Sequence, residues 1–369
     1  MAKVTGLEGI IAAETEISLV DGENGHLVYR GHWAKDLAIH YTFEECAYLL
    51  ITGKLPSEQE LHDFKNELQR HRDIPDHVRV IIDHLPLSMD MMSVLRTSVS
   101  ALGEPSFEWK PSLEQAIRVI AVVPTIIAYR YHKENNTEFI KPNNELSHVA
   151  NYLFMLQGIL PTEAQERALS AYFILTLEHG MNASTFSART VLSTETDFIS
   201  AITGAIGAMK GPLHGGAPTE VIHMLNDIET VDRAEHWLRN KLENGERIMG
   251  FGHRIYKTHD PRAVALKEIS QSLSGQDPWL DLALHVEGTT IRILDEYKPG
   301  RRLYTNVEFY AAAVLRAVNM PAELFTSTFT ASRVVGWSAH ILEQAEHNRI
   351  FRPQSKYVGN MPSKKSIEV

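Results

Sequence analysis

Three histidines stand directly beside glycines, where the backbone can turn and a ring can face a cleft. His179 lies in "LEHGMNASTFSAR", His214 in "KGPLHGGAP" and His253 in "GFGHRIYKTHDPRA". Imidazole can donate to or accept from a reacting group near neutral pH, so histidine is the most frequent acid–base residue. For any one of the 18 histidines a structural role is the simpler interpretation, and only their combination with other groups indicates chemistry.

A single carboxylate, Glu308, lies among apolar and aromatic residues in "YTNVEFY" (304–310). A charge in such surroundings costs on the order of several kcal/mol unless it is paired, protonated or used. Glu308 could lie on the solvent side of an amphipathic helix, or it could be a catalytic base. Arginine forks that suit a carboxylate ligand occur at Arg262, in the same stretch as His253, and at Arg333 and Arg352 further along the chain. Each of these arginines alone would be interpreted as a surface or interface ion-pair partner.

Helical signals dominate the elements that must position these residues. Capping boxes, in which Ser or Thr precedes Glu or Gln by three residues, predict helices that begin after Ser57, Ser112 and Thr162. Strand signals are confined to residues 17–30, where apolar and polar residues alternate on both sides of a Gly/Asn turn. The polar tail after Arg352 is expected to be extended. We therefore predict an all-α fold with one short N-terminal β-hairpin.

The glycine clusters at 210–218 and 250–253 do not fit the dinucleotide or P-loop patterns. There is no HExxH and no carboxylate–histidine spacing typical of zinc, so we expect no metal site. No GxSxG elbow presents Ser184 or Ser187 as a nucleophile. The clusters flank a charged amphipathic helix, and we place the domain boundaries there: a large domain of residues 1–210 and 318–369, and a smaller inserted domain of residues 211–317.

The composition excludes several classes of protein. The 369 residues, 44% apolar and 22% charged, suit a globular protein of about two domains. A net charge of −10 argues against broad binding to nucleic acid or to a membrane surface, so an anionic substrate would need a local cluster of cations. The longest apolar run is short and contains Pro124, and we expect neither a membrane span nor a signal peptide. The lone Cys46 excludes an internal disulfide and suits a core position in a reducing cytoplasm.

Taken together, the motifs resemble those of the citrate synthase family in its shorter bacterial and archaeal form, which includes the 2-methylcitrate synthases. "GPLHGGA", "GFGHRIYKTHDPRA", "NVEFY" and "RPQSKYVG" are similar to the family's signature segments and occur in the same order. The resemblance extends from "GLEGI" and "DGENGHLVYRGH" to the tail, so it covers essentially the whole chain. It implies a two-domain helical homodimer, without a cofactor, whose small domain closes over the active site.

The resemblance also implies roles for the matched residues. His214 would polarise the thioester carbonyl of acetyl-CoA, His253 would hydrogen-bond the ketone oxygen of oxaloacetate, and Glu308 would be the base. The carboxylates of oxaloacetate would be bound by His179, Arg262, Arg333 and, from the other subunit, Arg352. CoA would be bound by Arg247, Gly250, Gly252 and Lys257, with the backbone of 247–253 around the adenine and Lys257 near the phosphates.

The chemistry of such a reaction explains why it needs this set of groups. A thioester methyl proton has a pKa of about 20 and a carboxylate one of about 4, a mismatch of about 16 units or roughly 22 kcal/mol. A neutral histidine that donates to the carbonyl oxygen as the enolate forms supplies part of what the base cannot. A second donor would polarise the ketone, and arginines would hold the dicarboxylate. The product thioester, citryl-CoA, would then be hydrolysed.

Glu308 departs from the family, which usually has aspartate at this position ("NVDFY"). Glutamate carries the carboxylate roughly 1 Å further, and a displacement of that size can cost on the order of 100-fold in rate. We expect real activity as a citrate synthase, with a rate that the longer side chain can lower. The alternatives are 2-methylcitrate synthesis from propionyl-CoA and a non-catalytic paralogue that binds oxaloacetate or citrate. A last alternative, scattered structural residues on a helical scaffold, would require seven coincidental matches.

Overall fold

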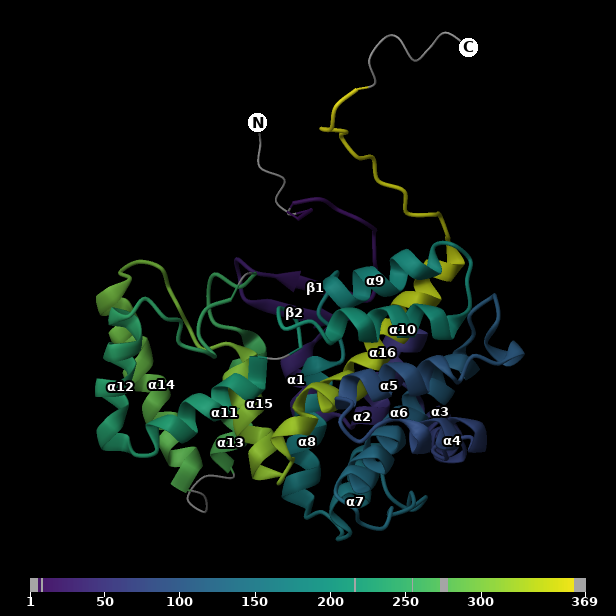
Figure 1. The fold of residues 1–369 in the computed structure, drawn as a ribbon, viewed down its shortest axis with the longest axis horizontal. Helices are drawn as coiled ribbons and strands as arrows, with labels where there is room; N and C mark the ends of the chain where they lie inside the picture. Colours follow the sequence, from purple (N-terminus) through teal and green to yellow (C-terminus); the bar gives the residue numbers. More distant parts are fainter. Residues whose placement is uncertain (1–5, 8, 216, 254, 273–277, 362–369) are drawn as a thin grey trace.

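The computed structural model describes residues 6–7, 9–215, 217–253, 255–272 and 278–361. Within these ranges the chain is predominantly helical, which confirms the predicted fold class (Figure 1). The first ten helices are α1 (Ala34–His40), α2 (Phe43–Thr52), α3 (Glu58–Arg70), α4 (Asp76–His84), α5 (Met91–Ser100), α6 (Leu113–Glu134), α7 (His148–Gln157), α8 (Glu163–Thr176), α9 (Ala183–Leu192) and α10 (Phe198–Met209). The remainder are α11 (Ala217–Ile228), α12 (Val231–Glu243), α13 (Pro261–Ser272), α14 (Pro278–Tyr297), α15 (Val307–Ala317) and α16 (Phe325–Glu346), with short 3₁₀ helices at Pro105–Phe107 and Ala322–Leu324.

The predicted N-terminal hairpin is confirmed. Strand β1 (Ser18–Asp21) pairs antiparallel with β2 (His26–Tyr29), so that Ser18 lies opposite Tyr29 and Asp21 opposite His26. A third strand, β3 (His32–Trp33), pairs with β2 and was not predicted, because two residues are too few to show alternation.

Local sequence signals account for where many helices begin and end. The capping boxes predicted at Ser57, Ser112 and Thr162 are all formed, and a fourth occurs at Thr42. Helix α2 ends at Gly53, whose φ of 87° lies in the left-handed region that favours glycine. These short-range contacts specify helix ends without reference to the rest of the fold.

The helices form two groups. Helix α16 packs against α2, α6, α8, α9 and α10, whereas α11 to α15 pack mainly on one another and lie together at the left of Figure 1. The groups meet where α13 and α15 contact α8, where α13 contacts α1, and where α11 contacts α16. The hairpin lies at the same junction. The division into domains at residues 211 and 317 stays a prediction.

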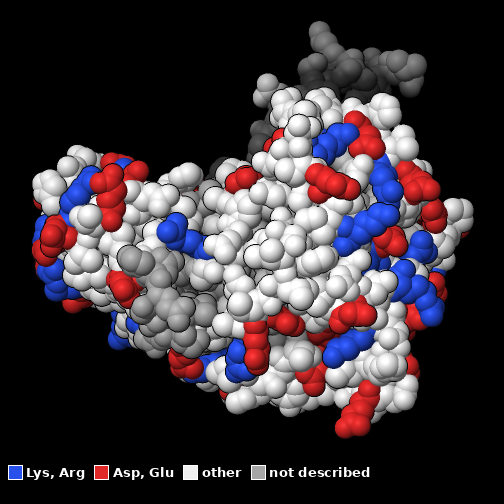
Figure 2. Space-filling view, turned by 90° about the horizontal axis from the view of Figure 1, so that it is seen from below, with Lys and Arg blue, Asp and Glu red and all other residues white. Residues whose placement is uncertain are grey.

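The core of the first group is apolar and tightly enclosed. Helix α6 runs through Pro124 from Leu113 to Glu134, and Cys46 is fully buried, which raises the pKa of its thiol. None of the described helices is long and apolar enough to cross a membrane. Figure 2 shows Lys and Arg side chains interspersed with Asp and Glu over the face seen from below.

Candidate functional site

A cavity of about 200 Å³ lies at the junction of the two groups of helices. Six of the residues singled out in the sequence line it, although they come from five separate segments: His179, His214, His253, Arg262, Glu308 and Arg333. The other lining residues are Tyr172, Thr176, Asn182, Leu213, Val307, Ala311 and Phe329. The fold thus gathers three imidazoles, two guanidinium groups and one carboxylate around a single space.

Glu308 lies in the first turn of α15, where Asn306 caps the helix and its Oδ1 accepts a hydrogen bond from the Glu308 N–H at 3.1 Å. The side-chain atom Oε2 is buried and has no hydrogen-bond partner among the described residues. Burial raises the pKa of Glu308, and the positive charge of Arg262 opposes that rise. The carboxylate therefore retains the capacity to accept a proton from something that enters the cavity.

Arg262 is held by a neighbour that the sequence did not reveal as part of the site. Asp260 is 1% exposed and accepts from Arg262 Nε at 3.0 Å and Nη2 at 2.8 Å. Its Oδ2 also accepts from the N–H of Val307 at 3.1 Å, at the start of α15. Burial alone would lower the pKa of Arg262, but Asp260 outweighs it, so the pKa is raised. One carboxylate thereby fixes both Arg262 and the helix that carries Glu308.

The ring of His253 is oriented by the backbone that follows it. Its Nδ1 accepts from the N–H groups of Ile255 at 3.1 Å and Tyr256 at 3.0 Å, which assigns the proton of the neutral ring to Nε2. Burial and Arg262 lower the pKa of His253 to about 4, so the ring is neutral at pH 7. Nε2 lies 3.4 Å from Arg262 Nη2. Two donors side by side form a place for a ligand oxygen.

His214 contacts a buried hydroxyl rather than a charge. Its Nε2 lies 2.7 Å from Ser184 Oγ, which accepts from Trp337 Nε1 at 3.0 Å. Ser184 Oγ also donates to Asn182 Oδ1 at 2.8 Å, an oxygen that accepts two backbone N–H groups as the cap of α9. Because a hydroxyl has one proton, donation to Asn182 Oδ1 and donation to His214 Nε2 are alternatives. When the proton turns to His214 Nε2, the imidazole proton is on Nδ1 and can be donated to a ligand. Burial and Arg333 lower the pKa of His214 to about 4.

His179 and Arg333 complete the lining. His179 Nε2 lies 3.2 Å from the hydroxyl of Tyr256, and its ring centre is 5.7 Å from that of His253. Burial, with Arg262 and Arg333, holds the pKa of His179 well below its usual value, so this ring is also neutral. Arg333 is 1% exposed and donates from Nε to the carbonyl of Thr176 at 2.6 Å.

The remaining predicted residues do not line the cavity. Arg352 is exposed in the extended tail, and Arg247 and Lys257 are exposed near the junction. Gly250 and Gly252 have φ values of 83° and 81°, and their backbone pairs with residues 304–306. Their glycine identity is therefore explained by backbone conformation, and this pairing holds the segment before His253 alongside the start of α15.

Four contributors were missed as members of the site, namely Ser184, Tyr256, Asp260 and Trp337. Of these four, Asp260 was the one that the sequence could have shown. It stands two residues before Arg262 in "HDPRA", and carboxylates often pair with a nearby arginine. Ser184 was weighed only as a nucleophile. Tyr256 and Trp337 lie in stretches already singled out, but nothing in their spacing shows what they contact. Within the described ranges, no group of three or more His, Cys, Asp or Glu side chains could hold a metal ion.

Comparison with known proteins identifies the family. The family model described as "Citrate synthase, C-terminal domain" matches residues 6–354. The chain belongs to the citrate synthase family. The citrate synthase of Synechocystis sp. is 39% identical over 96% of this chain and 90% of its own. The 2-methylcitrate synthase of Shewanella oneidensis is 38% identical over 97% of this chain and 96% of its own.

Solved structures agree with this assignment. Citrate synthase from Thermotoga maritima has a TM-score of 0.87 and 40% identity, covering 97% of this chain and 96% of that one. The citrate synthase of Thermoplasma acidophilum, solved in a ternary complex with carboxymethyl coenzyme A and oxaloacetate, has a TM-score of 0.89 at 32% identity, and the match covers 97% of each chain. By family, relatives and structure the chain is an enzyme of the citrate (Si)-synthase acyltransferase type.

Proposed function

We propose that the cavity condenses acetyl-CoA with oxaloacetate, and that His214, His253 and Glu308 perform the chemistry. Glu308 removes a methyl proton from acetyl-CoA while His214 donates a hydrogen bond to the thioester oxygen, on which enolate charge develops. The enolate carbon attacks the ketone carbon of oxaloacetate, and His253 Nε2–H donates a hydrogen bond to the oxygen on which alkoxide charge develops. The proton that Glu308 removed is returned to this oxygen through water, which restores the carboxylate. Water then hydrolyses citryl-CoA to citrate and CoA. The observation that carries the proposal is the buried Oε2 of Glu308, to which no residue in the described part of the chain donates a hydrogen bond, in a cavity lined by neutral imidazoles.

The charges around the cavity support a binding site shared between two subunits. Arg262 is already paired with Asp260. Burial lowers the pKa of Arg333, and the negative charge of Glu178 opposes this decrease. Because oxaloacetate is a dianion, it needs a further cation besides Arg262, Arg333 and the donor His179. We assign this role to Arg352 of a second subunit in a homodimer.

We propose that CoA is bound by Arg247, Gly250, Gly252 and Lys257. These residues belong to a small domain of residues 211–317, which closes on the large domain. The support is their position, since the backbone of 250–252 runs beside the first turn of the Glu308 helix. A thioester bound here would have its acyl end next to the carboxylate. The product is consistent with a role in the tricarboxylic acid cycle in the cytoplasm.

A 2-methylcitrate synthase among the relatives makes propionyl-CoA the second candidate substrate. Glutamate at position 308 occupies more of the acyl pocket than aspartate would, which favours the smaller acetyl group. Parallel steady-state kinetics with both acyl-CoAs and oxaloacetate, followed by thiol release, test the choice. We expect the higher kcat/KM with acetyl-CoA, and a preference for propionyl-CoA would overturn it. Oxaloacetate binding without release of CoA from either would instead establish a binding protein.

A further inference from the structure

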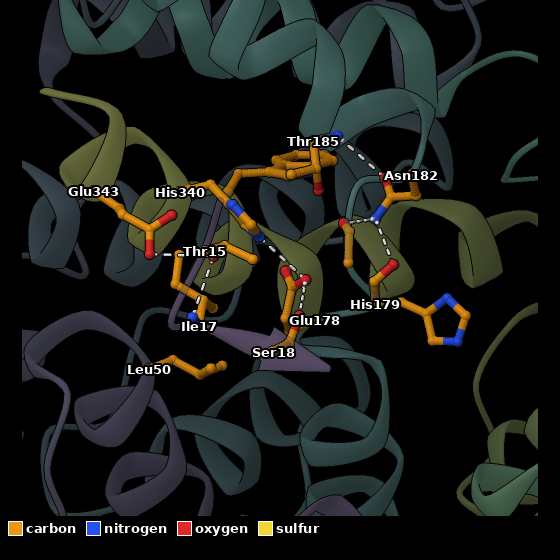
Figure 3. A network of polar contacts seen from close by, with 12 residues as sticks. Thr15, Ile17, Ser18, Leu50, Glu178, His179, Asn182, Thr185, His340 and Glu343 are labelled. Atoms are coloured by element: carbon orange, nitrogen blue, oxygen red, sulfur yellow. Dashed lines mark hydrogen bonds and ion pairs between the residues drawn. The ribbon is translucent and has the colours of Figure 1, made fainter. Parts of the chain in front are cut away.

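The β1–β2 hairpin contacts the two loops that carry His179 and His253. On the first side, Ser18 Oγ donates to Glu178 Oε1 at 2.9 Å, directly before His179 (Figure 3). Val20 lies against Gly180, the residue after His179, since a Cβ added at Gly180 would be 3.1 Å from Val20 Cγ2. β1 is thus fitted against the His179 loop by one hydrogen bond and one close packing contact.

On the second side, the turn of the hairpin lies against residues 255–259. The N–H of Lys257 donates to the carbonyl of Gly22 at 2.8 Å. The approach is so close that a Cβ at Gly22 would be 2.2 Å from the carbonyl oxygen of Ile255. A Cβ at Gly25 would be 2.7 Å from Thr258 Cγ2. Only glycine fits at these positions without separating the hairpin from the loop.

The loop that the hairpin touches is the one that orients His253. Ile255 and Tyr256 donate their backbone N–H groups to His253 Nδ1, and the Tyr256 hydroxyl contacts His179 Nε2. A shift of this backbone would therefore change both the tautomer of His253 and its distance from His179. The segment leading into the hairpin is itself anchored, because Glu343 Oε1 on α16 accepts from Thr15 Oγ1 and from the N–H of Glu16 at 3.1 and 2.9 Å.

We propose that the β1–β2 hairpin holds the His179 and His253 loops at a fixed separation, with Gly22 as a positioning residue for the condensation. The hairpin does not line the cavity with any side chain, so its influence on the reaction passes through the loop backbone. The expected loss of turnover rests on the proposed function of His253. The expected change in the position of the His253 ring proton does not depend on that function.

The test is Gly22→Ala, with Gly207→Ala as the matched control. A Cβ at Gly207, in α10, would meet nothing within 4 Å. For Gly22→Ala we expect kcat to fall roughly 10- to 100-fold, because displacements of about 1 Å have effects of this size. The control should stay within about twofold of the wild type. Equal kcat and KM in wild type and Gly22→Ala would overturn the proposal, as would an equal loss in the control.

A second readout needs no turnover. Long-range ¹H–¹⁵N spectra of the histidine rings, with the His253 signals assigned from their loss in His253→Gln, report where the ring proton lies. In the wild type we expect the proton on Nε2, and in Gly22→Ala a mixture of tautomers. An unchanged His253 spectrum would refute the positioning role. Because this signal is independent of the acyl substrate, failure of the proposed function would be seen separately, as absent activity in the wild type.

If Gly22→Ala does not fold, Ser18→Ala tests the other contact without adding an atom. Removal of the hydroxyl that binds Glu178 should raise the KM for oxaloacetate roughly 2- to 10-fold and shift the ring signals of His179. Unchanged KM and unchanged His179 signals in this variant would overturn the proposal.

Discussion

Glu308 combines a function that requires its charge with surroundings that oppose it. Burial raises its pKa, so in the folded protein the carboxyl group binds a proton more tightly than in the unfolded chain, where its pKa is about 4.5. By linkage, its charged form destabilises the fold above the folded-state pKa, and this cost disappears as the pH falls below 4.5. Such a cost is expected of a residue kept for chemistry rather than for stability.

Glu308→Gln should therefore separate activity from stability. We expect turnover to fall about 10²- to 10⁴-fold, the usual contribution of a general base, while oxaloacetate still binds. At pH 8 the Tm should rise by about 1–3 °C, because the buried charge is gone. Thermal unfolding followed by circular dichroism gives the Tm of wild type and variant at pH 8 and at pH 5, and the gain in Tm should be smaller at pH 5. Thiol release from acetyl-CoA measures the loss of turnover. Retained turnover would show that the base is another residue.

Glu308→Asp tests whether the longer side chain limits the rate. From the same backbone, glutamate places its carboxylate roughly 1 Å beyond the position that aspartate would reach. We expect Glu308→Asp to raise kcat by about 10-fold or more, with the KM for oxaloacetate unchanged. A fall in kcat would mean that α15 has locally adjusted to glutamate.

At the scale of elements, the sequence predicts what depends on neighbours in the chain. The capping boxes at Ser57, Ser112 and Thr162 and the hairpin were predictable because the interacting groups are close in sequence. The bonds from Asp260 to Val307 and from Trp337 to Ser184 were not, since they join residues 47 and 153 positions apart. The reactive residues of the cavity could be predicted because they are charged or lie beside a glycine in the sequence. The groups that orient those residues have no such feature in the sequence.

The contact between α16 and the end of α8 depends on one glycine. A Cβ at Gly336 would lie 2.2 Å from the carbonyl oxygen of Leu177 and 2.6 Å from Glu178 Oε2. Gly336→Ala must push the two segments apart, and we expect a loss of about 1–3 kcal/mol in the free energy of unfolding. Urea denaturation measures it, with Gly207→Ala expected to stabilise by up to about 1 kcal/mol. Equal stability of Gly336→Ala and wild type would show that α16 can shift without cost.

At the scale of the whole molecule, the described segments nearest the two termini, residues 9–15 and 350–361, extend from the same side of the body (Figure 1). Both carry strongly exposed apolar side chains, including Ile11 at 86% and Val358 at 85%. Exposed apolar groups on extended segments are costly unless another surface covers them. Arg352 lies on one of these segments, away from the cavity of its own chain. These features support a dimer in which the tail of each subunit reaches the site of the other.

Mixing two inactive variants tests this shared site. Arg352→Ala should bind oxaloacetate weakly and Glu308→Gln should lack the base, so each homodimer has little activity. In a heterodimer, the site with the intact Glu308 would receive the intact Arg352 from its partner, while the other site would have neither. After random exchange of subunits at equal amounts, half of the dimers are mixed and half of their sites complete, so about a quarter of wild-type activity should return. If the mixture stays as inactive as its components although exchange is demonstrated by mass spectrometry, Arg352 acts within its own subunit or not at all.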